Sequence, residues 1–584
     1  MKSDVTEKGL SNVQPAARGT KLTVLFLSLM LVGFFLLFIR CIYLQYFRFK
    51  HYDSLSTQLQ LKWIPVQSQR GVILDSMGRV LAGSSACRTV FAEPRVIENP
   101  ERISVRLAPI LDMPPQIVYR KITESFNPGF VRLKKDVSYE IAKNAQKIHY
   151  GIGAKTGWKR NYPTASLVSN VVGFTGADNQ GLEGLELEYD DVLEGQKGRQ
   201  SFLADSARRS IRLKSRGIEP KPGNAVILTI DSTIQQFARS HLLQRYKKYN
   251  AESAVAIVAS PDTGAILAMV SLPDFDPSDI NDFAAENFRN RAITDEFEPG
   301  SVIKPLVAAI ALDEGVVSTD EKIDCEEGSY SGKGFGSITE FRNHSYGDFT
   351  VREILVHSSN IGMAKLGQRL GRERLYEGLR RFGFGQRSGI ELPGEADGLL
   401  RVPSRWTGYS VTRIPFGQEI SVTAIQLVQA YCILANGGYL IEPHLVKAVV
   451  NKDGETVKYH SSLPAVGYAV KPRVAEWVTS VAMKDVVEEG TGTRVKLEKW
   501  TVFGKTGTAN IAKEDGSGYS EDNYVASFIA GAPAEDPRVV VFVSIRKPAK
   551  SLGMGYTGGA VASPVAASIV KDTLTYLENL DLLK

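Results

Sequence analysis

Cysteine is scarce in this chain, with four residues among 584. Cys41 lies at the edge of a hydrophobic segment, so at most one disulfide could form among Cys87, Cys325 and Cys432. That excludes the disulfide framework of a small secreted protein. None of the spacings suits a metal site, and we expect no metal and no cofactor. We predict that all four cysteines are packing residues.

The chain also lacks a strong charge of one sign. Its 70 Lys and Arg residues stand against 64 Asp and Glu residues, which leaves a formal net charge of +6. No basic run is interleaved with aromatic residues, so nucleic acid is excluded as a partner. Internal repeats and low-complexity segments are absent. The length and a content of 43% apolar residues are typical of a globular protein with two or more domains.

Long hydrophobic runs are rare too, and the clear one extends from Leu22 to Ile39. The amphipathic stretch from Cys41 to Phe47 follows it, so a continuous helix would be long enough to span a bilayer. A cleaved signal peptide is the alternative, but the run is long for one and no small-x-small cleavage site follows. We therefore predict an uncleaved anchor at 22–44. Basic residues flank both ends, so charge does not settle its orientation.

The first half of the chain shows a mixture of strand and helix patterns. Residues 67–82 predict two short strands around the turn Asp75–Gly78. Residues 100–148 mix charged and apolar side chains at helical spacing. A polar, basic segment from Asp205 to Lys221 ends at Pro222-Gly223, which is the candidate domain boundary.

Beyond that boundary the pattern is that of a compact α/β domain. The domain begins with a strand, an amphipathic helix capped by Asp231 or Ser232, and a hairpin. It ends with another pair of apolar strands and a helix. This arrangement predicts an antiparallel sheet with strands from both ends of the domain. The expected elements are strands at 226–230, 254–259, 265–271, 525–532 and 539–544, and helices at 232–249 and 564–580.

Three short strings in the second half carry the candidate chemistry. They are Ser301-Val302-Ile303-Lys304, Ser358-Ser359-Asn360 and Lys505-Thr506-Gly507-Thr508. In the first string the hydroxyl and the amine share one face if a helix passes through them. Pro305 and the apolar run after it predict that helix, with Ser301 at its N-terminus, where free amides favour negative charge.

Each string alone is weak evidence, because two of them recur elsewhere. Ser544–Lys547 continues a strand, and Ser568–Lys571 lies inside the last helix. Lys155–Gly157 is expected to lack both a neighbouring nucleophile and a strand to carry it. Ser358-Ser359-Asn360 could be an ordinary cap of a helix at 361–370. The three strings in this order, each in a suitable setting within one domain, argue against coincidence.

With these strings the chain resembles the class B penicillin-binding proteins, which are membrane-anchored peptidoglycan D,D-transpeptidases. The resemblance implies an α/β (α+β) transpeptidase fold with a central antiparallel sheet flanked by helices. It implies a cytoplasmic tail at 1–21, the anchor at 22–44, an elongated pedestal (dimerisation) domain at 45–221 and the transpeptidase domain at 222–584. Other segments that carry the resemblance are Arg70–Ala82, Arg160–Pro163, Gly181–Glu186, Phe297–Ser301, His357–Asn360 and Tyr556–Gly559.

The resemblance also implies roles for the residues of the three strings. Ser301 would attack the penultimate D-Ala carbonyl of a stem peptide and form an acyl-enzyme. Lys304 would be the base, because desolvation and the second cation at Lys505 keep its amine partly neutral. Ser358 would relay the proton to the leaving amine, and Asn360 would orient Lys304 and the substrate amide.

The third string would bind the substrate. Lys505 and Thr506 are expected to hold its terminal carboxylate by charge-assisted hydrogen bonds. Gly507 would keep the strand edge clear for the peptide backbone. The backbone amides of Ser301 and Thr508 are the family's oxyanion-hole positions.

Several rival functions remain to be weighed. A class A β-lactamase needs a deacylating carboxylate, usually in a Glu-x-x-Leu-Asn string, and no such string lies between Ser358 and Lys505. Transpeptidation is therefore favoured, outside the cytoplasmic membrane, with β-lactams as covalent ligands.

Phe297–Ser301 and His357–Asn360 look most like the division-specific branch, whereas Ser76-Met77 and Pro415–Glu419 depart from it. The elongation branch, a β-lactam sensor and a non-catalytic division scaffold are the alternatives. A polytopic glycan polymerase and other division proteins are the partners that the resemblance implies.

Overall fold

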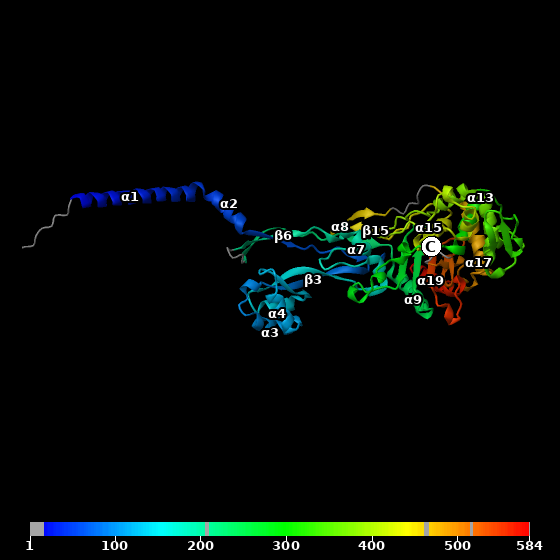
Figure 1. The fold of residues 1–584 in the computed structure, drawn as a ribbon, viewed down its shortest axis with the longest axis horizontal. Coiled ribbons are helices and arrows are strands. Elements are labelled where there is room, and N and C mark those ends of the chain that lie inside the picture. Colours follow the sequence, from blue (N-terminus) through cyan, green and yellow to red (C-terminus); the bar gives the residue numbers. More distant parts are fainter. Residues whose placement is uncertain (1–16, 205–209, 461–466, 514–517, 583–584) are drawn as a thin grey trace, which may run out of the picture. The chain divides into compact units, whose positions relative to one another are not determined.

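The structure is a computed structural model, and it describes residues 17–204, 210–460, 467–513 and 518–582. The chain divides into two compact units, one formed by residues 1–66 and 197–220 and the other by residues 67–196 and 221–584 (Figure 1). Most of the tail expected at 1–21, and residues 205–209 of the expected boundary segment, lie outside the described residues.

The first unit contains the expected membrane helix. Helix α1 (Ala17–Ile42) continues through a π-helical turn (Tyr43–Phe47) to α2 (Phe49–Gln60). Within the described residues, Thr20–Phe47 is the one helix long and apolar enough to cross a membrane, with a mean hydropathy of 2.8 and no part of that window buried. The single N-terminal apolar helix is therefore confirmed. An antiparallel sheet in the order β1-β6-β7 completes the unit, with strands Leu61–Val66, Gly198–Ala204 and Ser210–Ile218.

A seven-stranded sheet in the second unit combines strands from residues 73–161 with three strands from later in the chain. The hairpin predicted at 67–82 is present as β2 (Ile73–Leu74) and the start of β3 (Val80–Ala92). The sheet order is β16-β15-β8-β2-β3-β4, with β5 also paired to β3. The remaining strands are β4 (Val131–Val137), β5 (Ile152–Asn161), β8 (Ala225–Leu228), β15 (Val446–Val450) and β16 (Thr456–Tyr459).

Two strand assignments expected from the sequence differ from what this sheet shows. Lys155–Gly157 does lie on a strand, β5, because β3 pairs with it along its whole length although few of its side chains are apolar. The strand expected at 226–230 exists as β8, but it pairs with β2 and β15 in this sheet. Helices α3 (Pro100–Leu111), α4 (Pro115–Thr123) and α5 (Tyr139–Gln146) share a core with β3, β4 and β5.

A five-stranded antiparallel sheet in the order β10-β9-β19-β18-β17 forms the centre of the remaining part. Its strands do come from both ends of the predicted domain, as the sequence indicated. They are β9 (Ser253–Ala259), β10 (Ile266–Leu272), β17 (Phe503–Ala512), β18 (Tyr519–Ala532) and β19 (Val539–Arg546). The fold class predicted from the sequence is confirmed.

Helices cover both faces of this sheet. Alternate side chains such as Ala256 and Val541 pack with α9 (Ser232–Lys248) and α19 (Ser563–Asn579) on one face. Their neighbours Ile257 and Phe542 belong to the core on the other face, as the alternation of strand side chains requires. That second core holds α11 (Lys304–Asp313), α12 (Val351–Val356), α13 (Asn360–Arg381), α15 (Ala424–Ala435), α16 (Pro472–Trp477) and α17 (Lys484–Glu488).

Short elements connect these layers. They are α6 (Ser169–Val172), α7 (Gly184–Glu188), α8 (Asp190–Glu194), α10 (Arg291–Thr294), α14 (Ser410–Arg413) and α18 (Gly558–Val561), with the small sheets β11 (Ile323–Asp324) on β14 (Asp348–Phe349) and β12 (Ser329–Gly332) on β13 (Gly336–Thr339).

Candidate active site

Ser301 lies where the chain enters the buried helix α11. A 3-10 turn, Gly300–Ile303, precedes α11, whose first residue is Lys304. Residues three apart eclipse one another in such a turn, so Ser301 and Lys304 are held on the same side. Gly300 has a φ of +56°, a conformation that favours glycine. The turn therefore fixes Ser301, the predicted nucleophile, on a regular element at the start of α11.

The loop between α12 and α13 brings the second string to Lys304. The fully buried Lys304 Nζ donates to the Ser358 carbonyl oxygen at 2.6 Å, to Ser358 Oγ at 3.2 Å and to Asn360 Oδ1 at 2.8 Å. Ser358 itself has a φ of +57°, which is rare for a residue with a side chain. Such strain is retained where the surrounding contacts fix the residue, and functional sites are common places for it.

The third string approaches Ser358 from the sheet. Lys505, on β17, is fully buried, and its Nζ donates to Ser358 Oγ at 2.9 Å. Burial lowers the pKa of Lys304 to about 7, and the Glu340 carboxylate opposes part of that shift. Burial also lowers the pKa of Lys505 well below its ordinary value, and the charge of Lys304 lowers it further. Two amines with depressed pKa values thus meet at one hydroxyl.

Ser301 Oγ makes no hydrogen bond to any other described residue of the chain. Lys304 instead donates to Ser358 and Asn360. In free enzymes catalytic hydrogen bonds are often long and tighten only when substrate binds. The hydrogen bonds of Lys304 therefore centre on Ser358 and Asn360, while the half-buried Ser301 lines the cleft beside them.

A cleft with a volume of about 350 Å³ contains the predicted residues. Ser301, Ser358, Asn360, Thr506 and Thr508 all line it, while the side chains of Lys304 and Lys505 are buried behind it. Its wall also includes residues that the three strings did not predict: Glu298, Glu340, Phe341, Arg342, His344, Tyr346, His357, Gln418, Thr491, Asn510, Tyr519, Thr557 and Gly559. The Tyr556–Gly559 string was the one signal in the sequence that pointed to the last two.

Two threonines present their hydroxyls at the β17 side of this cleft. Thr506 Oγ1 shares a hydrogen bond of 3.0 Å with Thr491 Oγ1, and Thr508 Oγ1 accepts from the Gly558 amide at 3.1 Å. Gly507, between them, faces inward. A Cβ there would lie 2.3 Å from Ser527 Oγ and 2.9 Å from Val302 Cγ1, so glycine allows β17 to pack against the Ser301 turn.

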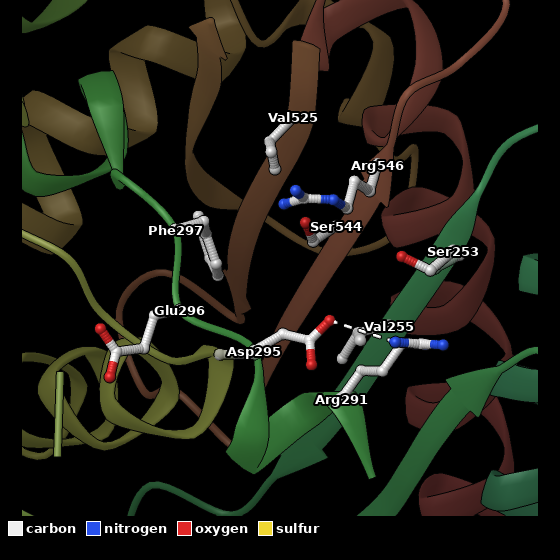
Figure 2. Close-up of a pocket in the computed structure, with 11 residues that line it drawn as sticks. Ser253, Val255, Arg291, Asp295, Glu296, Phe297, Val525, Ser544 and Arg546 are labelled. Atoms are coloured by element: carbon white, nitrogen blue, oxygen red, sulfur yellow. Dashed lines mark hydrogen bonds and ion pairs between the residues drawn. The ribbon is translucent and has the colours of Figure 1, made fainter. Parts of the chain in front are cut away.

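The recurring copies of the strings lie elsewhere. Ser568 is inside α19, where its hydroxyl donates to the Pro564 carbonyl oxygen. Ser544, on β19, lines a recess with Arg546 and with the Arg291–Asp295 ion pair of 3.4 Å (Figure 2). The volume of that recess is about 30 Å³, roughly the share of one water molecule in the liquid. It is too small for a peptide.

Among the described residues there is no group of three His, Cys, Asp or Glu side chains that could hold a metal. All four cysteines are free, and Cys87, Cys325 and Cys432 are buried.

Comparison with known proteins extends these observations. Residues 65–228 match the family model of the penicillin-binding protein dimerisation domain. Residues 254–571 match the model of the penicillin binding protein transpeptidase domain.

Curated relatives cover most of the chain. It is 34% identical over 548 residues to Stage V sporulation protein D of Bacillus subtilis, which covers 92% of this chain and 82% of the relative. It is 29% identical over 515 residues to the peptidoglycan D,D-transpeptidase FtsI of Escherichia coli, which covers 87% of this chain and 84% of the relative.

Solved structures are similar as well. A peptidoglycan synthetase from Bifidobacterium adolescentis has a TM-score of 0.72 at 25% identity, with 89% of this chain and 97% of that chain covered. Penicillin-binding protein 3 of Mycobacterium tuberculosis, complexed with aztreonam, has a TM-score of 0.68 at 28% identity, with 88% and 97% covered.

Proposed function

This chain belongs to the class B penicillin-binding proteins and is a peptidoglycan D,D-transpeptidase, and we propose that it cross-links stem peptides through an acyl-enzyme on Ser301. One observation supports the proposal most directly. Two buried lysines, Lys304 and Lys505, donate to the same Ser358 hydroxyl in a cleft that Ser301 also lines.

The acylation step follows from these positions. Neutral Lys304 accepts the Ser301 proton as Ser301 Oγ bonds to the penultimate D-Ala carbonyl carbon. The C–N bond to the terminal D-Ala then breaks, Ser358 gives its proton to the departing amine, and Lys304 returns the proton taken from Ser301 to the Ser358 hydroxyl. Lys505 and Thr506 hold the terminal carboxylate, and the amides of Ser301 and Thr508 stabilise the oxyanion.

The second step transfers the acyl group to an amine. The amine of a neighbouring stem peptide attacks the ester carbonyl, a new amide bond forms, and the Ser301 hydroxyl is restored. Water is a poor competitor, because the sequence has no Glu-x-x-Leu-Asn string between Ser358 and Lys505 to activate it. A β-lactam ring that acylates Ser301 by the same attack would remain bound for the same reason.

The substrate sets the topology in this proposal. Stem peptides lie outside the cytoplasmic membrane, so the chain crosses it once through 22–44, with the pedestal domain at 45–221 and the transpeptidase domain at 222–584 on the outer side. We propose that the activity serves septal wall synthesis, because the segments Phe297–Ser301 and His357–Asn360 resemble the division-specific branch of the family. Depletion of the protein in cells tests this assignment to the division branch. Filamentous cells would support a role in division, whereas rounded cells would assign the enzyme to elongation.

Labelling with a fluorescent penicillin tests the acyl-enzyme itself. We expect wild type and Ser568→Ala to be labelled equally, since Ser568 is a matched serine of the same Ser-x-x-Lys pattern inside α19. Ser301→Ala should lose the label. If Ser301→Ala is still labelled, the nucleophile is assigned wrongly; if wild type is not labelled, the proposed chemistry fails.

A further inference from the structure

Glu340 is a buried carboxylate that lies directly behind the second string. It follows β13, and its exposed fraction is 3%. Its Oε1 accepts from Ser359 Oγ at 2.5 Å and from the Ile361 amide at 3.2 Å, while Oε2 accepts from the Asn360 amide at 2.7 Å. One carboxylate therefore holds three consecutive residues at the start of α13.

The same strand end also fixes the orientation of the Asn360 side chain. Asn360 Nδ2 donates to the Thr339 carbonyl oxygen at 3.0 Å. A carbonyl can only accept, so the amide nitrogen must face Thr339, and Oδ1 must face Lys304. Lys304 Nζ donates to that oxygen at 2.8 Å. The Asn360 side chain thus links the end of β13 to the Lys304 amine by two consecutive hydrogen bonds.

The charge of Glu340 acts on the same amine. Two elements bring charged groups to Lys304: Lys505 comes from β17 and Glu340 from the end of β13. Tyr431, from α15, reaches the turn that precedes Lys304. Tyr431 donates to the Val302 carbonyl oxygen and stays neutral, because burial raises its pKa well above the ordinary value. Among these groups Glu340 carries the negative charge.

We propose that Glu340 is a positioning residue for acylation, which holds the 359–361 segment so that Asn360 faces Lys304 and which places a negative charge near the two buried lysines. It does not touch the reacting atoms. Its hydrogen bonds to Ser359 and to the Asn360 amide fix the position of the Asn360 side chain. Its negative charge favours the protonated form of Lys304. This inference rests on the proposed acyl-enzyme at Ser301.

The Glu340→Gln variant separates these effects from simple helix capping. Because the carboxylate raises the pKa of Lys304, its removal should shift the acid limb of the acylation rate to lower pH, by about one unit. The plateau rate should fall about tenfold or more, since an amide cannot accept all three hydrogen bonds. Glu340→Asp keeps the charge, so its acid limb should stay in place while its shorter side chain lowers the plateau.

Another capping carboxylate supplies the matched control. Glu353 caps the neighbouring helix α12, accepting from the Thr350 amide and hydroxyl at 2.8 Å each. Glu353→Gln removes a helix cap away from the cleft, so its acid limb and plateau should match wild type.

The experiment measures the rate constant for acylation of the full-length protein by a fluorescent penicillin from pH 5.5 to 8.5, together with melting temperatures. An acid limb of Glu340→Gln that coincides with wild type overturns the inference, as does a failure of both Glu340 variants to fold. If Glu340→Gln alone fails to fold, Glu340→Asp decides: an unchanged limb with a lowered plateau supports positioning, and an unchanged plateau refutes it. If wild type is not acylated at Ser301, it is the proposed function that fails.

Discussion

Two buried lysines that donate to one hydroxyl cannot both hold a full positive charge at low energetic cost. Lys304 and Lys505 are fully buried, and each donates to Ser358 Oγ. Like charges a few ångströms apart repel far more strongly inside a protein than in water. The site therefore favours one neutral amine near neutral pH, which is the form that a base requires.

The pH dependence of acylation follows from this charge balance. The pKa of Lys304 is lowered to about 7, and the neutral amine, the form present above that pKa, is the proposed base. We expect the rate constant for acylation by penicillin to fall about tenfold per pH unit below that value and to level off above it. Stopped-flow or gel-based labelling checks this, and a rate constant that stays flat down to pH 5 would contradict Lys304 as the base.

Gly507 gives a second prediction for a single residue. Its inward Cβ position lies 2.9 Å from Val302 Cγ1 in the Ser301 turn, so Gly507→Ala should displace that turn and lower acylation at least tenfold, since small misplacements of reacting groups cost about 10² in rate. Gly157→Ala, in the recurring Lys-Thr-Gly copy, is the control, because its nearest atom is Cys87 Sγ at 3.5 Å. Equal acylation by both variants would refute this packing argument.

The residues of the site differ in how far the sequence could predict them. Ser301, Lys304, Ser358, Asn360 and Lys505 could be predicted together, because the three strings that contain them occur in one domain and in the order of a known family. Glu340 left no such signal, since a single glutamate just after a short strand gains its role only where the end of β13 meets the start of α13. The inward direction of Gly507 was likewise invisible, because it depends on how β17 packs on the turn.

Elements show the same contrast between local and long-range information. Strands β9 and β19 are runs of buried apolar residues, so the sequence predicted them nearly at their bounds. Strand β18 begins at Tyr519 rather than at the expected Val525, because its first residues are mostly polar and less buried, and only its second half has the apolar pattern. Strands β5 and β8 are partly exposed or short, and their partners come from distant parts of the chain. Pairing with such partners is what makes Lys155–Gly157 a strand, and periodicity alone cannot show it.

Close packing of α13 on α11 gives a prediction about an element. A Cβ on Gly378 would lie 2.5 Å from Ile310 Cγ2. Gly378→Ala gains about 1 kcal/mol of helix preference, but overpacking costs about 1–3 kcal/mol. We expect a net loss of stability, seen as a melting temperature lowered by a few degrees. Glu377→Ala, at the adjacent exposed position, should change it little. A raised melting temperature for Gly378→Ala would mean that the two helices can separate without loss.

For the whole molecule, the apolar N-terminal helix and the proposed catalytic residues fall in different compact units. The helix Thr20–Phe47 is in the first, whereas Ser301, Lys304, Ser358 and Lys505 are all in the second. A chain that lacks residues 1–47 should therefore leave the membrane fraction and keep the wild-type rate of acylation by penicillin. Fractionation of cells and labelling of the soluble fraction measure both properties. If the shortened chain stays with the membrane, another surface binds lipid or a membrane protein; if it is soluble but loses acylation, the helix supports the site as well as anchoring it.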